Sequence, residues 1–229
     1  MKVTTDGCLF GAWVAGRIKN EKLIINNCLD IGTGTGLLSL LLAQKMDAPI
    51  DAIEIDKQAF EQATENAAAA PWNKRIKVFH ADAKNFSGKH PYNLIISNPP
   101  FYENELKSGS NRKNVAHHSD DLEFKDLLIT IKKNLHPDGI FCLLLLFKRN
   151  KEIKKLLTEH DFIVLQMTFV RPSVNHDYFR IMLIGKLKTG ETTETMIDEI
   201  SIKEGSLINP EQQYSPAFVN LLKDYYLHM

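Results

Sequence analysis

Short apolar segments alternate with helical segments along most of the chain, and this alternation limits the possible folds more than any other feature. Seven segments have the length and composition of buried strands: 23–31, 50–55, 75–79, 92–97, 140–147, 162–170 and 178–186. Helical patterns separate most of them, over 36–45, 57–70, 122–135 and 151–160. Such an alternation predicts an α/β fold with a doubly wound, seven-stranded and mostly parallel sheet. Because no helix separates the last two strands, we expect that pair to be antiparallel.

The size and composition of the chain favour a single globular domain. The 229 residues suit one α/β domain that spans 1–229, and 44% hydrophobic with 24% charged residues is typical of globular proteins. The longest apolar run, 140–147, is too short to cross a bilayer, and the N-terminus carries no apolar signal segment. We therefore expect no membrane association.

Cysteine and histidine usage argues against disulfides and metal sites. Three scattered cysteines form neither a disulfide framework nor a metal-binding pair, which favours the reducing cytoplasm. None of the eight histidines has the spacing of a metal site, so we expect no metal. Lys+Arg and Asp+Glu balance at 28 each. This balance argues against a protein that coats nucleic acid non-specifically, but it allows a local basic patch.

A glycine-rich turn follows the first strand, in the sequence Asp30-Ile31-Gly32-Thr33-Gly34-Thr35-Gly36. Glycine allows backbone to approach a ligand closely, because no Cβ stands in the way. Dinucleotide enzymes use a similar turn, although their glycine spacing differs from this one. A turn that binds nothing rarely needs three glycines, so we interpret this one as a nucleotide-binding turn.

Acidic residues follow the next two strands. Glu54 ends the second strand, where a carboxylate can accept both hydroxyls of a ribose. Asp82 follows the third strand and can accept a hydrogen bond from an adenine amine, while the backbone of Ala83 contacts the ring edge. Taken singly, Glu54 would more often be a solvated charge at a strand end, and Asp82 could simply cap its loop. The nearby Asp56 is better interpreted as the N-cap of the next helix. The order of Glu54 and Asp82 at successive strand ends is what favours a nucleotide site.

The fourth strand runs into Asn98-Pro99-Pro100-Phe101. Two prolines in succession restrict the backbone and remove two amide donors. The side-chain oxygen of Asn98 and the carbonyl of Pro99 can then accept both hydrogens of one substrate amine. Phe101 offers a flat face on which a base can stack, and Pro100 lies on the same substrate side. The alternative is a rigid turn with a buried aromatic side chain.

An irregular segment, 101–120, interrupts the alternation of strands and helices. A loop of this length is usually functional in a compact domain, and we expect it to border the substrate. It carries the cations Lys107, Arg112 and Lys113. We expect these residues to contact substrate phosphates, together with Arg180 beside the last loop.

This series of motifs resembles the class I methyltransferases that modify amino nitrogens and have a Rossmann-like fold. Within them, the terminal segments Met1-Lys2-Val3-Thr4-Thr5-Asp6-Gly7, Gly11-Ala12-Trp13, Tyr214-Ser215 and Tyr225-Tyr226-Leu227 are similar to the bacterial tRNA adenine-N6 methyltransferases of valine tRNA. The resemblance covers almost the entire chain in order. It implies S-adenosylmethionine as cofactor and tRNA as partner.

The resemblance also implies individual roles. Asp30, Gly32 and Gly34 would hold the methionine part of the cofactor, and Thr5 and Asp6 would close over it. Asn98 would contact both cofactor and substrate, and Trp13 would be a core residue. Where the family commonly has arginine after alanine, this chain has His117, so a titratable group replaces a fixed cation on the substrate side.

Several alternatives remain open at this stage. The same pocket could serve a DNA adenine, a guanine in ribosomal RNA or a protein glutamine. A dinucleotide-dependent oxidoreductase would leave Asn98-Pro99-Pro100-Phe101 unexplained. A non-catalytic RNA-binding protein would have no need to retain Asn98 and the glycine-rich turn.

Overall fold

The fold is built on one eight-stranded sheet in the order β3-β2-β1-β4-β5-β7-β6-β8. The computed structural model describes residues 3–20, 23–100, 124–190, 193–205 and 213–226. The strands are β1 (Cys28–Ile31), β2 (Ile50–Glu54), β3 (Ile76–His80), β4 (Tyr92–Ser97), β5 (Leu135–Leu146), β6 (Phe162–Ser173), β7 (Arg180–Leu187) and β8 (Met196–Lys203). Strands β3, β2, β1, β4 and β5 pair in parallel, β7 is antiparallel to both β5 and β6, and β8 is parallel to β6. The α/β class and the antiparallel pair are therefore confirmed.

The eighth strand was not predicted from the sequence. β8 forms the outer edge of the sheet, and its first four residues, from Met196 to Glu199, are exposed. An edge strand with two exposed apolar residues followed by two acids lacks the alternation by which a half-buried strand is recognised. β8 can be recognised as a strand only in the folded chain, where it pairs with β6.

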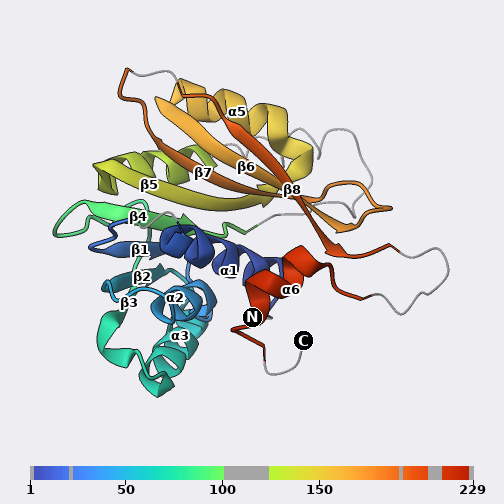
Figure 1. Cartoon of the computed structure of the whole chain (residues 1–229). Helices are drawn as coiled ribbons and strands as arrows, with labels where there is room; N and C mark the ends of the chain where they lie inside the picture. The colour runs from blue at the N-terminus through green and yellow to red at the C-terminus, as the bar shows by residue number, and fades with distance from the viewer. Residues whose placement is uncertain (1–2, 21–22, 101–123, 191–192, 206–212, 227–229) are drawn as a thin grey trace, which may run out of the picture.

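Helices cover both faces of the sheet (Figure 1). One face carries α1 (Thr5–Asn20), α2 (Leu37–Ala43), α3 (Lys57–Ala69) and α6 (Pro216–Leu222), and the other carries α5 (Asn150–Glu159) and the helical residues 124–134. Short 3-10 turns, η1 (Asn73–Arg75) and η2 (Phe147–Arg149), follow α3 and β5. Two apolar clusters form the core, one on each face. In the part of the chain that the structure describes, no helix has the length and apolarity needed to cross a membrane.

Local signals set several of these boundaries. The Asp56 side chain accepts a hydrogen bond from the amide of Ala59 at 2.8 Å, so it is the N-cap of α3 as predicted. Ser215 caps α6 in the same way, and Pro216 occupies the first turn, where its missing amide is not needed. β5 begins earlier than predicted, since Leu135 already pairs with Tyr92 before a register shift leads to the regular ladder.

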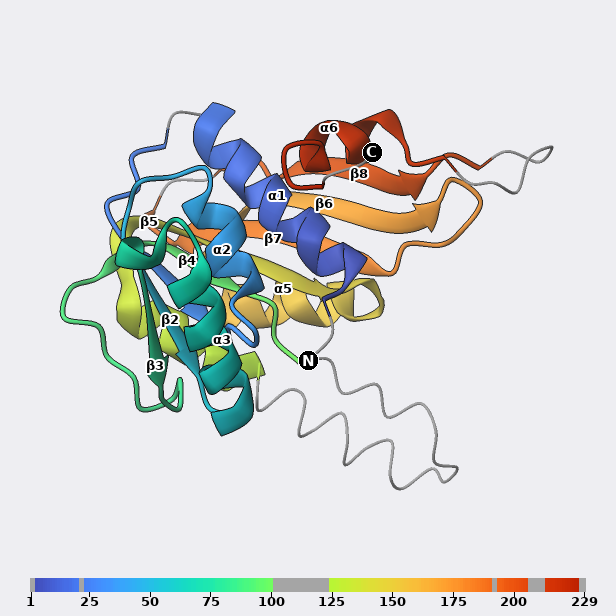
Figure 2. The same cartoon turned by 90° about the horizontal axis from the view of Figure 1, so that it is seen from below.

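Helix α1 packs between α2 and α6, and its first turn reaches the carboxyl ends of the strands (Figure 2). Close approach to α2 depends on Gly11, because a Cβ there would lie 2.5 Å from Cδ1 of Leu41. Trp13 is only 4% exposed, which confirms its prediction as a core residue. An ion pair between Asp6 and Arg180, at 2.7 Å, joins the first turn of α1 to the first residue of β7.

Replacing Gly185 tests the packing of β7 against β5. A Cβ at Gly185 would lie 2.4 Å from Cζ of the fully buried Phe141 and 3.0 Å from the carbonyl oxygen of Ile163. We expect Gly185→Ala to lower the free energy of unfolding by about 1–3 kcal/mol, with a fall in Tm of several degrees. Gly16→Ala is the control, because a Cβ there meets only Leu221 at 3.7 Å and alanine favours a helix. Equal Tm values for Gly185→Ala and wild type in thermal denaturation would contradict the prediction.

Candidate active site

The predicted site residues come together at one edge of the sheet because the parallel strands end in register. Ile31 at the end of β1 pairs with Ile53 on one side and with Ser97 on the other. Glu54 pairs with His80 at the end of β3. The glycine-rich turn, Glu54 and Asn98 therefore leave the sheet side by side, as expected for a doubly wound fold.

The glycine-rich turn has the backbone conformation for which glycine was expected. Gly32, Gly34 and Gly36 have φ angles of 69°, 61° and 86°, a region that side chains disfavour. The amides of Gly32 and Thr33 both donate to the carbonyl of Ile53, at 2.9 and 3.0 Å. A Cβ on Gly32 would meet nothing within 4 Å, so the space above it is open for a ligand.

Asp30 lies beneath this turn and is fully buried. Its Oδ2 accepts hydrogen bonds from the hydroxyls of Thr33 and Ser39, both at 2.7 Å, and from the Ser39 amide at 3.2 Å. Its Oδ1 has no hydrogen-bond partner. Burial raises the pKa of Asp30 to about 6, although the bonds from Thr33 and Ser39 oppose the rise and the charge of Glu54 adds to it. Asp30 thus braces the turn with one oxygen and leaves the other available for a donor.

Glu54 ties the turn to the end of β2. Its Oε2 accepts from the Gly34 amide at 2.8 Å, and its Oε1 accepts from the amides of Ile55 and Asp56, both at 2.9 Å. An ionised carboxylate has about four lone-pair positions, so these bonds leave little further capacity. A ribose that uses both oxygens of Glu54 has to share them with, or displace, one of these amides.

Asp82 and Ala83 lie beside Glu54 on the loop after β3. Asp82 accepts a hydrogen bond from the Lys84 amide at 2.9 Å and a longer one from Asn85, so its side chain caps its own loop. The carbonyl of Ala83 accepts from the hydroxyl of Thr130 at 3.3 Å. Both residues still border the cavity at this edge of the sheet.

A cavity of about 330 Å³ opens at this edge, within the size range of small-molecule sites. One wall consists of the predicted cofactor residues Gly32, Glu54, Asp82 and Ala83 with the two prolines of the Asn-Pro-Pro turn. The other wall is mostly apolar and comes from the helical residues 124–134, the end of β5, η2 and α5. The lining includes Gly32, Glu54, Asp82, Ala83, Ser97, Pro99, Pro100, Phe124, Leu127, Leu146, Arg149 and Ile153.

Asn98 occupies the point where the strand ends meet the first turn of α1. The hydroxyl of the preceding Ser97 donates to the carbonyl of Ile31 at 2.8 Å, which holds the two strand ends together. The Oδ1 atom of Asn98 is buried and has no partner. Gly7 of α1 lies close by, since a Cβ there would be 3.9 Å from Nδ2 of Asn98. An unpaired buried acceptor is costly, and a ligand that donates a hydrogen bond would offset this cost.

Three other predicted site residues lie near α1 rather than on the cavity wall. The sequence predicted that Asp6 contacts the cofactor and that Arg180 contacts the substrate, but these two side chains form an ion pair with each other. Thr5 is exposed. Burial opposes ionisation of Asp6, but hydrogen bonds from Thr4 and Arg180 outweigh it and hold its pKa below the usual value. The roles of these residues toward ligands stay predictions.

The predicted residues Phe101, Lys107, Arg112, Lys113 and His117, and with them the loop 101–120, lie outside the described residues. Among the described residues, no group of three or more potential ligands could hold a metal ion.

Sequence reasoning missed the cationic part of the cavity wall. Arg149 lines the cavity with its side chain 17% exposed, and it makes two hydrogen bonds to Glu152, at 2.9 and 2.8 Å. From the sequence it is one cation in a cluster after the fifth strand. The available signal was its place shortly after a buried strand, at the same edge of the sheet as Glu54 and Asn98. Lys84 and Asp126 line the cavity too and form an ion pair at 2.7 Å.

Comparison with known proteins identifies the family. The sequence profile of the family described as methyltransferase small domain matches residues 16–163. A protein of Phocaeicola vulgatus named tRNA1(Val) (adenine(37)-N6)-methyltransferase is 34% identical over 229 residues, covering 100% of this chain and 92% of that protein. A protein of the same name from Dyadobacter fermentans is 35% identical over 232 residues, covering 99% and 91% of the two chains.

Solved structures share the fold at lower sequence identity. A crystal structure described as a predicted O-methyltransferase from Agrobacterium tumefaciens aligns with a TM-score of 0.68 at 18% identity, over 95% of each chain. At this identity the likeness establishes the Rossmann-like fold alone, and the sequence relatives and the family profile carry the assignment. The chain therefore belongs to the methyltransferase small domain family, together with the relatives named tRNA1(Val) (adenine(37)-N6)-methyltransferase.

Proposed function

We propose that this protein transfers a methyl group from S-adenosylmethionine to the exocyclic N6 amine of an adenosine in tRNA, with the anticodon loop of valine tRNA as the substrate region. The observation that carries the proposal is the buried, unpaired Oδ1 of Asn98 at the end of β4, next to an open cavity and a glycine-rich turn. Full-length similarity to proteins named for this reaction supports the choice of substrate.

The residues present fit the cofactor. The unpaired Oδ1 of Asp30 is an acceptor suited to the ammonium group of the methionine part, and the open space above Gly32 admits a ligand. We assign the ribose to Glu54 and the adenine to Asp82 with Ala83, because all three line the cavity. S-adenosylmethionine, when bound, supplies an electrophilic methyl group. Thr5 and Asp6 complete the cofactor side from α1.

Asn98 and Pro99 would prepare the substrate amine. An adenine amine is a poor nucleophile because its lone pair is delocalised into the ring. When Oδ1 of Asn98 and the carbonyl of Pro99 accept its two hydrogens, they favour a pyramidal nitrogen and stabilise the positive charge that develops on it. The adenosine has to leave its stack to reach this position. We assign its stacking to Phe101 and Pro100.

The RNA would extend over the loop 101–120 of this single domain. Lys107, Arg112, Lys113 and His117 directly follow the Asn-Pro-Pro-Phe turn, which supports their role as phosphate contacts. Arg180 contributes through its position beside the first turn of α1. We place the protein in the cytoplasm, which its free, buried cysteines favour.

Transfer of tritiated methyl from S-adenosylmethionine to total tRNA, followed by nucleoside analysis, tests this function. We expect the label in N6-methyladenosine and in valine tRNA, because the amine-binding turn and the sequence relatives both point there. DNA, ribosomal RNA and protein serve as competing acceptors. Label in one of these instead of tRNA would refute the substrate assignment.

Asn98→Ala tests the amine contact. We expect the variant to lose methyl transfer by about a hundredfold or more, because the charge developing on the amine loses its acceptor. Its affinity for S-adenosylmethionine, measured by calorimetry, should stay close to that of the wild type. Asn73→Ala in the exposed η1 turn is the control and should be fully active. An active Asn98→Ala variant would show that the amine is held elsewhere.

Glu54→Gln tests the ribose contact. An uncharged amide accepts hydrogen bonds more weakly, and its NH₂ group faces donors at Gly34 or at Ile55 and Asp56. We expect the Kd for S-adenosylmethionine to rise about tenfold. Glu61→Gln is the matched control, since Glu61 is exposed on α3 and forms an ion pair with Lys57 at 3.8 Å, away from the cavity lining. An unchanged Kd for Glu54→Gln would remove Glu54 from the cofactor site.

A further inference from the structure

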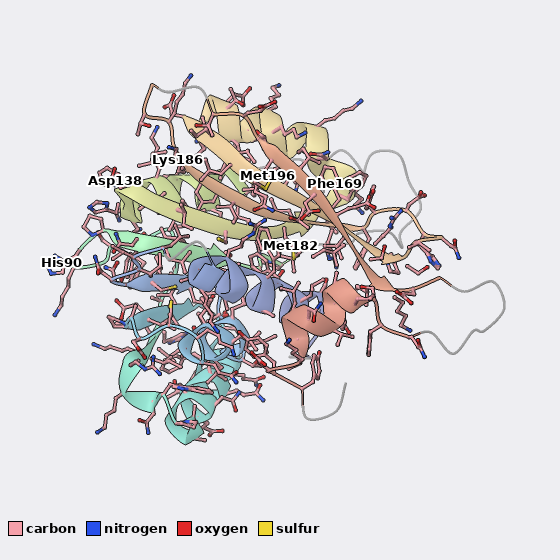
Figure 3. All side chains as sticks on the ribbon, in the orientation of Figure 1. His90, Asp138, Phe169, Met182, Lys186 and Met196 are labelled. Carbon is pink, nitrogen blue, oxygen red and sulfur yellow. The ribbon has the colours of Figure 1, made fainter. Side chains whose placement is uncertain are left out.

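Three aromatic rings meet where β5, β6 and β7 reach the catalytic edge. Phe169 of β6 is labelled in Figure 3. Its ring centroid lies 5.2 Å from that of Phe147 in η2, and the two rings are nearly perpendicular. Tyr178 lies 5.2 Å from the first ring and 5.5 Å from the second. Each ring therefore contacts the other two, and we name these three residues the aromatic platform.

The aromatic platform is packed on the core but not enclosed by it. Phe147 and Phe169 rest against the apolar cluster under α5, yet all three rings stay partly exposed. If these rings served only to pack the core, we would expect the fold to cover them completely. Aromatic rings that remain accessible at the edge of a site are the surfaces on which nucleobases stack.

A guanidinium adds to this surface. Arg171 lies over the Tyr178 ring, with its Cζ 5.4 Å from the centroid. It is held there by Glu199 at 2.7 Å and by Ser201 at 2.8 Å, and Glu199 also accepts the hydroxyl of Tyr178. These contacts use two of the five N–H donors of the guanidinium and neutralise the nearest carboxylate. Arginine planes stack on bases and bind phosphates, so this arrangement suits a nucleotide.

The aromatic platform is joined to the wall of the cavity through η2. Leu146 and Arg149 both line that cavity. Phe147 directly follows Leu146 in the sequence and lies two residues before Arg149. The amide of Phe147 donates to the carbonyl of Phe179 at 3.1 Å, which joins η2 to the segment that carries Tyr178. Arg180 pairs in register with Leu146 and with Val170, so the ends of the three strands are level.

We propose that the aromatic platform, with Arg171, binds the base of a nucleotide next to the target adenosine and thereby holds the RNA on the enzyme. The proposal rests on the proposed function and adds a substrate surface to it. A base that leaves its stack exposes its neighbours, and a stacking surface beside the pocket compensates for the lost contacts. Three aromatic rings and a cation provide such a stacking surface for any base, because stacking does not depend on which base is present.

Tyr178→Ala and Tyr178→Phe test the surface. Using a hairpin RNA that carries the anticodon loop, we expect Tyr178→Ala to raise the KM for RNA at least about fivefold, as for the loss of one base stack. Its kcat at saturating RNA and its Kd for S-adenosylmethionine should stay within about twofold of wild type. Tyr178→Phe keeps the ring and should retain the KM. Phe60→Ala, which removes a ring stacked on His80 at the opposite edge of the sheet, is the matched control.

A thermodynamic cycle that combines the protein variant with altered RNAs tests the stacking surface without relying on one protein variant alone. The base is deleted in turn from each nucleotide flanking the target, leaving an abasic site. Wild type should bind one of these RNAs at least about fivefold more weakly, and Tyr178→Ala should show no further loss with that RNA. The abasic result on wild type stands even if the alanine variant folds poorly.

The outcomes separate the two proposals. If wild type methylates the hairpin while Tyr178→Ala keeps its KM, or if the two losses simply add, the aromatic platform is not the stacking surface and the proposed function stands. If wild type transfers no methyl to any RNA, the proposed function fails and the RNA surface is refuted with it.

Discussion

The carboxylate of Glu54 joins the glycine-rich turn after β1 to the residues that lead from β2 into α3. Its two oxygens accept the amides of Gly34 in the turn after β1 and of Ile55 and Asp56 at the start of α3. Because β1 and β2 are adjacent and parallel, one side chain at the end of β2 can reach the turn that follows β1. The same group is proposed to hold the ribose. Cofactor binding and the shape of the glycine-rich turn are therefore coupled through a single carboxylate.

Among the described residues, three buried side-chain oxygens have no partner. One is on Asn150 at the start of α5, and the other two, on Asp30 and Asn98, each suit a different ligand group. Oδ1 of Asp30 suits an ammonium donor, and Oδ1 of Asn98 suits an amine. Folded proteins pair nearly all their buried polar atoms, so unpaired acceptors beside a cavity indicate groups kept for a ligand. For Asp30 the other oxygen braces the turn, so the proposed cofactor contact and the support of the turn come from one residue.

The antiparallel half of the sheet adds the substrate side. The ion pair between Asp6 and Arg180 holds the first turn of α1 against β7 and so near Asn98. The same strand ends carry the aromatic platform, whose Phe147 belongs to η2 together with the cavity residue Arg149. This half of the sheet thus supplies both a brace for the catalytic turn and the proposed surface for RNA.

Sequence alone determined the α/β class, seven of the eight described strands along the chain and the motifs that end the strands. It also determined the N-cap at Asp56 and the burial of Trp13. These features are local, since hydrophobic period, glycine and proline act within a few residues. Tertiary structure decided what depends on strand order and packing across long separations. It paired Asp6 with Arg180, brought Glu54 to Gly34, added β8 to the edge and placed Arg149 in the cavity wall. No local pattern contains these contacts, because each arises only when the sheet brings distant strand ends level with one another.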